Sequence, residues 1–167
     1  MEHLVGIFRE ALAAIHEPRL FETERGYQGA LLAELHQRLI HAGLPGDPII
    51  EQEYQKTLPH HGIKIRPDLI IHVPFERGLN RRAEGNFVAV EIKLRATQAE
   101  ADEDFKSLET LHSALAYPLT IFLNIDSSET HAHRCPKNIA GQAVCFAVRL
   151  REQNPVVVMS RCADLGV

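Results

Sequence analysis

The chain has 167 residues, of which 45% are hydrophobic and 24% charged, as expected for one soluble globular domain with a real core. Its formal net charge of −4 argues against a generally basic nucleic-acid binder, although residues 56–95 hold 8 Lys/Arg against 4 Asp/Glu and so carry +4. No apolar run approaches the roughly 18 residues of a membrane span, and the first residues are too polar for a signal peptide. Three cysteines without close pairing favour reduced thiols, so we expect a cytoplasmic protein that does not engage membranes.

The first 43 residues predict two helices. Apolar residues recur at helical spacing from Leu4 to Ile15, and Pro18 ends that pattern. The second helix closes at Gly43 and carries an apolar stripe at Tyr27, Leu31, Leu35 and Leu39.

Three predicted strands follow. Residues 49–58 alternate loosely, and residues 65–73 form a strand that begins near Pro67, where a missing N–H is tolerated. After the loop 74–86 comes "NFVAVEIKL", residues 86–94, the most regular strand pattern of the chain.

The rest of the chain predicts one helix and three more strands. Residues 97–114 are helical, with an acidic start that suits the helix dipole. Strand patterns then appear at 117–125, 143–150 and 155–161. Because there is no repeat and no convincing linker, we expect a single α/β domain over residues 1–167.

Two unlike charges stand inside the apolar strand 86–94. Alternate side chains of a strand point to opposite faces, so Phe87, Ala89, Glu91 and Lys93 share one face, and the Val, Ile and Leu residues form the other. If this strand pairs antiparallel with residues 65–73, Asp68 lies on the face of Glu91 and Lys93. The pattern therefore predicts two carboxylates and one ammonium at one end of a hairpin.

That combination suits a particular chemistry. Carboxylate oxygens are ligands for a hard cation such as Mg²⁺ or Mn²⁺, which retains waters and bridges phosphates. Such an ion lowers the pKa of a bound water and neutralises charge on a phosphodiester. The lysine could orient the nucleophile or stabilise developing negative charge.

The arrangement Pro67-Asp68-(x)22-Glu91-x-Lys93 resembles the PD-(D/E)xK nuclease superfamily. The resemblance implies a restriction-endonuclease-like core, α-β-β-β-α-β, with a central mixed β-sheet flanked by helices over about residues 24–126. It implies Mg²⁺-dependent hydrolysis of phosphodiester bonds in nucleic acid, DNA ahead of RNA, with Asp68 and Glu91 as metal ligands and Lys93 as the catalytic lysine. The alternative is a catalytically inactive member of this fold that binds nucleic acid or a protein. We also consider a homodimer, because one small domain reaches only one strand of a duplex.

Many members of this superfamily carry a further acid on the helix before the sheet. Glu34 is the best match, because it borders the apolar stripe expected to face the sheet. Glu24 is its rival, since "ERGYQGALLAEL" is similar to the "ExxYQ…EL" helix of the GxxExxY branch. Glu53, on the first strand, is a weaker candidate, and each of these acids could instead be a solvated surface residue. For substrate contacts, the loop 74–86 offers Arg77, Arg81 and Arg82 to phosphates.

Overall fold

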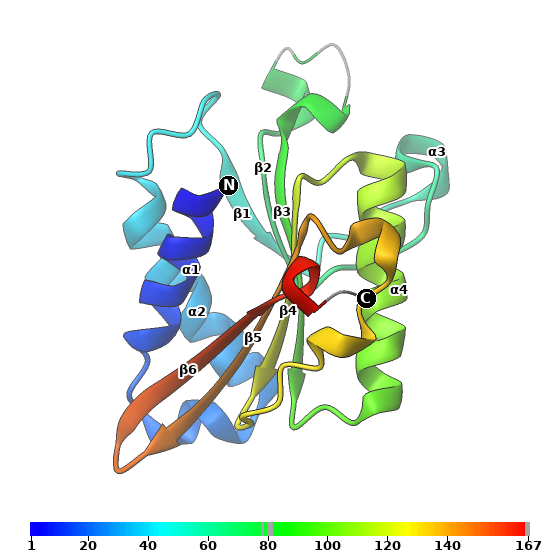
Figure 1. Ribbon diagram of the computed structural model, residues 1–167. Coiled ribbons are helices and arrows are strands. Elements are labelled where there is room, and N and C mark those ends of the chain that lie inside the picture. The colour runs from blue at the N-terminus through cyan, green and yellow to red at the C-terminus, as the bar shows by residue number, and fades with distance from the viewer. Residues whose placement is uncertain (78, 80–81, 166–167) are drawn as a thin grey trace.

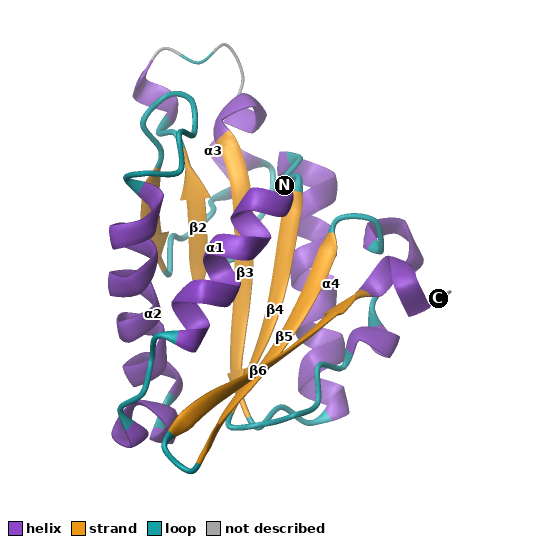
Figure 2. Cartoon of the chain, turned by 60° about the vertical axis from the view of Figure 1, so that its left-hand side comes forward, coloured by secondary structure: helices purple, strands orange, loops and turns teal. Residues whose placement is uncertain are grey.

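The computed structural model describes residues 1–77, 79 and 82–165 as one α/β fold with a mixed sheet between helices (Figure 1). The main helices are α1 (Glu2–Ala13), α2 (Glu24–Leu39) and α4 (Gln98–Leu115). The six strands are β1 (Ile49–Gln52), β2 (Leu69–His72), β3 (Asn86–Leu94), β4 (Leu119–Ile125), β5 (Ala143–Arg151) and β6 (Asn154–Arg161). Helices α1 and α2 cover one face of the sheet and α4 covers the other (Figures 1 and 2). No helix in the described part of the chain is long and apolar enough to cross a membrane.

The strands lie in the sheet in the order in which they occur along the chain. Strands β1, β2 and β3 form an antiparallel meander, whereas β3, β4 and β5 run parallel and β6 returns antiparallel to β5. Parallel neighbours need a crossover, and α4 supplies it between β3 and β4. The carboxyl ends of β3, β4 and β5 therefore meet at one edge of the molecule.

The predicted order of helices and strands is confirmed, but several boundaries are wrong. Helix α1 ends at Ala13, and Pro18 begins a short 3₁₀ helix instead of ending the first helix. The strand expected over 49–58 stops at Gln52, because Glu53 adopts a positive φ of 48°, and Leu58–His61 forms the short helix α3. The ends of α1 and β1 are set by local backbone geometry, which the spacing of apolar residues does not predict.

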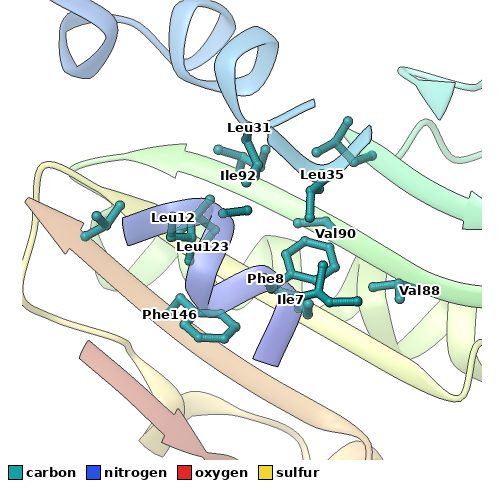
Figure 3. Packing of buried hydrophobic residues seen from close by; sticks show 14 of the residues in the cluster. Ile7, Phe8, Leu12, Leu31, Leu35, Val88, Val90, Ile92, Leu123 and Phe146 are labelled. Atoms are coloured by element: carbon teal, nitrogen blue, oxygen red, sulfur yellow. The ribbon is translucent and has the colours of Figure 1, made fainter. Parts of the chain in front are cut away.

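Two hydrophobic cores lie on opposite faces of the sheet. The first fills the space under α1 and α2, where Phe8, Leu12, Leu31 and Leu35 meet the Val and Ile side chains of β3 (Figure 3). The second lies under α4 and is built from Ile70, Ala89, Phe105, Leu108, Leu111 and Phe122, among others. The predicted apolar row of β3 is thus confirmed as core-facing.

Phe87 is on the other side from the one predicted. It packs against the α1/α2 core, whereas Ala89 packs under α4. The register between β2 and β3 shifts between Ile71 and His72, so that Ile71 pairs with Val88 but His72 pairs with Asn86. This irregularity breaks the alternation at Phe87, which simple parity cannot anticipate.

Candidate functional site

Asp68, the residue directly before β2, is fixed by hydrogen bonds from three partners. Leu69 pairs with Val90 in the antiparallel β2–β3 ladder, so Asp68 comes beside the carboxyl half of β3. Its Oδ2 accepts a hydrogen bond of 2.6 Å from the Ile92 N–H. Its backbone carbonyl accepts from Gln28 Nε2 at 2.7 Å and from the Glu53 N–H at 3.0 Å. The antiparallel pairing predicted for these two strands is confirmed.

Glu91 lies almost buried between β3 and α4. Only 6% of the residue is exposed, and its Oε1 accepts a hydrogen bond of 2.7 Å from the Ser107 hydroxyl. Burial raises the pKa of Glu91 well above its usual value, and the charge of Asp68 raises it further. Both effects disfavour the ionised form of this carboxyl, and the charge of Lys93 offsets only part of them.

The carboxyl groups of Asp68 and Glu91 influence one another electrostatically. Burial raises the pKa of Asp68, while the Ile92 N–H and the Lys93 charge work to lower it. The charge of Asp68 in turn raises the pKa of Glu91. Because two like charges repel, a proton or a cation shared by the pair would stabilise it.

Lys93 projects from β3 toward α4 beside the two carboxyls. Its Nζ lies 3.4 Å from Asp104 Oδ1. Burial works to lower the pKa of Lys93, but the charges of Asp104, Asp68 and Glu24 raise it above the usual value. The ammonium therefore keeps its proton at neutral pH.

Asp104 joins the same cluster from α4. Burial raises its pKa to about 6, against the opposing influence of Lys93. Its Oδ2 is buried and has no hydrogen-bond partner among the described residues. We call Asp68, Glu91, Lys93 and Asp104 the carboxylate–lysine cluster.

The donor set of this cluster fits a hard divalent cation. In residues 1–77, 79 and 82–165, no group of three His, Cys, Asp or Glu side chains is arranged to hold a metal ion. Mg²⁺, however, commonly uses one or two carboxylates and keeps several waters. Asp68 and Glu91 would be the two carboxylates of such a site, because each affects the pKa of the other.

The three candidate upstream acids lie in different places. Glu34 pairs with Arg38 on the same helix and lies ten residues, or about 15 Å, beyond Glu24. Glu24, in the first turn of α2, raises the pKa of both Lys93 and Asp104. Thus Glu24 reaches the carboxylate–lysine cluster electrostatically, and Glu34 is not brought to it.

Glu53 also influences the carboxylate–lysine cluster through its charge. It pairs with Arg66 at 3.4 Å and with Arg25 at 3.8 Å, and its charge raises the pKa of Asp68. The fold therefore brings two of the three candidate acids, one from α2 and one from the end of β1, toward Asp68 and Lys93.

Sequence reasoning missed three residues that support the site: Gln28, Asp104 and Ser107. A signal for Asp104 was available, because it lies three residues after Ala101 and four before Leu108, on the buried stripe of α4. Gln28 likewise lies among the buried residues of α2 and is only 5% exposed. A polar residue on an apolar helical stripe is thus the pattern to look for.

The predicted phosphate-contacting loop is only partly described. The Arg77 guanidinium donates to the backbone carbonyl of Asp47. Arg81 and the side chain of Arg82 lie outside the described residues. At the edge where β3 and β5 end, Arg149 and Arg151 are exposed, and Arg95 pairs with Asp126 at 2.6 Å.

A scan against protein-family models finds no match for this chain, and searches of curated proteins and of solved structures find none either.

Proposed function

We propose that this chain is a metal-dependent phosphodiesterase that cleaves nucleic acid, DNA ahead of RNA, and that it is a PD-(D/E)xK nuclease. The observation that carries the proposal is that Asp68, held by the Ile92 N–H, and the almost buried Glu91 lie close enough to affect each other's pKa, with the Lys93 charge acting on both. Burial disfavours the charged form of both carboxyls, and a divalent cation would offset that cost.

Asp68 and Glu91 would hold the cation. When bound, the ion supplies Lewis-acid stabilisation of phosphate charge and a water of lowered pKa. The chain's own groups hold the ligands in place: the Ile92 N–H binds Asp68, and the Ser107 hydroxyl binds Glu91.

Lys93 is the proposed electrostatic catalyst. It stays protonated, so its ammonium can donate to a phosphate oxygen and stabilise negative charge that develops during cleavage. Asp104 orients it from α4, with Nζ and Oδ1 3.4 Å apart. A phosphate that approaches Lys93 would compete with Asp104 for the ammonium.

The arrangement of elements supports the family proposal. Helix α2, the antiparallel strands β1, β2 and β3, helix α4 and the parallel strand β4 follow one another over residues 24–125. This order, and the mixed character of the sheet, agree with the α-β-β-β-α-β core that the resemblance implies.

A nucleic-acid substrate is supported by the basic side chains near the cluster. Because β3 and β5 are parallel, Arg95 after β3 and Arg149 and Arg151 on β5 lie at the edge that also carries Lys93. Arginines at such positions can bind phosphates and position a backbone without reading its sequence.

The proposal is tested by a cleavage assay with Mg²⁺ or Mn²⁺ on linear, nicked and branched DNA and on RNA. We expect cleavage that EDTA abolishes, and a loss of about 10²–10³-fold or more in Asp68→Asn, Glu91→Gln and Lys93→Ala. Lys106→Ala is the matched control, because Lys106 is exposed on α4 and we expect full activity. Undiminished cleavage by purified Lys93→Ala would contradict the role given to this lysine.

The same assay separates the upstream acids. Glu24→Gln removes a charge that raises the pKa of Lys93, and Glu53→Gln removes one that raises the pKa of Asp68. Glu34→Gln instead alters a residue that is paired with Arg38. We expect a loss of activity in at least one of the first two variants and none in the third.

A binding module without catalysis is the second candidate. It is favoured by the finding that, within the described residues, no third His, Cys, Asp or Glu completes a metal-binding group with Asp68 and Glu91. This function predicts nucleic-acid or protein binding in EDTA, unaffected by Glu91→Gln, and no cleavage of any substrate with either metal.

A further inference from the structure

Strand β6 forms one edge of the sheet and exposes apolar side chains there. It pairs with β5 on one side only, and the sheet order ends with it. Val156, Val158 and Met159 are 37%, 36% and 37% exposed. The tip of the β5–β6 hairpin is the lowest point of the molecule in both overall views (Figures 1 and 2).

The backbone of β6 also has hydrogen-bonding groups directed away from β5. Arg151 pairs with Asn154 across the two-residue turn Glu152–Gln153, whose φ angles are both positive, as in a tight hairpin. Hydrogen-bonded and non-hydrogen-bonded pairs alternate from that turn, so Val157 and Met159 direct their N–H and C=O groups outward. The described residues form no backbone hydrogen bond to these outward groups.

Native edge strands commonly carry devices that block pairing with another chain, and β6 has few of them. It contains no lysine, and its Arg161 is paired with Glu2 of α1 at 2.5 Å. Pro155 removes one outward N–H near the turn, but the stretch from Val156 to Met159 has every donor. With eight residues, β6 is also twice as long as β1, the other edge strand.

The sequence of β6 is complementary to itself when read antiparallel about Val157. Val157 then pairs with Val157 of a second copy through two backbone hydrogen bonds, and Met159 donates to the carbonyl of Pro155. On the face toward α4, Val156 comes opposite Val158, so the two exposed valines of each copy meet. Branched apolar side chains in such cross-strand pairs stabilise a sheet.

The charges at the two ends of β6 agree with this register. Arg161 would lie opposite Gln153 of the other copy, next to Glu152 at the turn. Arg161, which pairs with Glu2 of its own chain, would thus also come near an acidic group of the other copy, and this would occur twice because of the twofold symmetry.

From these observations we propose that β6 is the interface for a second copy of this chain, with the two strands antiparallel about Val157 and the two sheets joined into one. The two six-stranded sheets would make a continuous sheet of twelve strands. This inference does not depend on the proposed nuclease activity, because the carboxylate–lysine cluster lies on β3, on α4 and directly before β2.

The oligomeric state of the full chain in solution tests the interface. Light scattering after size exclusion should give twice the chain mass of 18.8 kDa for the native protein. Val158→Lys should give the mass of a monomer, because it places like charges beside the axis. Ile40→Lys is the matched control, since Ile40 is 78% exposed on the end of α2, and it should remain dimeric. A native monomer, or a dimer that survives Val158→Lys, overturns the proposal.

Cross-linking tests the register independently of that variant. Val157→Cys should form a disulfide-linked dimer under mild oxidation, because the residue faces itself across the axis, whereas Val156→Cys should not. The native Cys135, Cys145 and Cys162 are all buried and should not react. Equal cross-linking by both variants, or none by Val157→Cys, contradicts pairing about Val157. Nuclease activity is not a readout in either experiment.

Discussion

Asp104 is the side chain of α4 that forms an ion pair with Lys93. It is 7% exposed, carries one oxygen near the Lys93 ammonium and has another that is buried without a partner. Burial of a carboxylate disfavours its charged form, and one ion pair offsets only part of that cost. The fold therefore keeps a carboxyl group whose charged form is disfavoured next to Lys93 of β3.

The raised pKa of Asp104 predicts a pH dependence of stability. In the folded protein the pKa is about 6, against 3.8 for an ordinary aspartate. Between these values the folded state binds more protons than the unfolded state, so the free energy of unfolding falls as pH rises from about 4 to 6. At about 1.4 kcal/mol per pKa unit, the fall due to Asp104 amounts to up to about 3 kcal/mol.

Asp104→Asn should remove this fall, because an amide does not titrate. Denaturant titrations of both proteins between pH 4 and pH 7.5 would measure it. Parallel stability profiles for the native protein and the variant would contradict the assignment. Asp102→Asn is a suitable control, because the pKa of Asp102 is lowered by its exposed pairing with Arg134.

At the scale of the element, α4 begins with a complete capping box. The Thr97 hydroxyl accepts from the Glu100 N–H at 3.3 Å, and Glu100 Oε2 accepts from the Thr97 N–H at 2.8 Å. Two backbone donors of the first turn are thereby satisfied. The cap fixes where the helix starts and hence where Asp104 and Ser107 meet β3.

Loss of this cap should destabilise the protein measurably. We expect Thr97→Ala to lower the free energy of unfolding by about 1 kcal/mol, and Thr97→Ser to retain most of it because serine keeps the hydroxyl. Urea unfolding of the two variants beside the native protein provides the measurement. If Thr97→Ser were as unstable as Thr97→Ala, the capping hydrogen bond of the hydroxyl would not be the source of the stabilisation.

The strand elements were predictable to different degrees. Strand β3 was predicted with its ends, because nine residues of alternating apolar pattern leave little ambiguity. Strand β1 was predicted too long. It has only four residues, because Glu53 adopts a positive φ, and the spacing of apolar residues does not predict that conformation. The sense in which the strands pair required chain topology as well as pattern.

At the scale of the whole molecule, cation binding should be linked to folding. Only the folded chain brings Asp68 and Glu91 close enough to affect each other's pKa, so a cation held by both would stabilise the native state. At a free Mg²⁺ concentration 100 times its Kd, the gain would be about 2.7 kcal/mol.

Calorimetry with Mg²⁺ and with EDTA would measure this linkage. We expect the native protein to melt at a higher temperature with Mg²⁺, and Glu91→Gln to lose the increase. An equal increase in both proteins would mean that the ion acts elsewhere on the molecule.

The sequence alone determined the order of the helices and strands, the core-facing row of β3 and the shared face of Glu91 and Lys93. These features depend on residue periodicity, which is local and can be read along the chain. The tertiary structure decided that Asp104 and Ser107 join the cluster, that Glu24 and Glu53 reach it while Glu34 does not, and that β6 is left as an open edge. Those outcomes depend on where α2 and α4 begin relative to the ends of the strands, and packing between distant segments sets that relation.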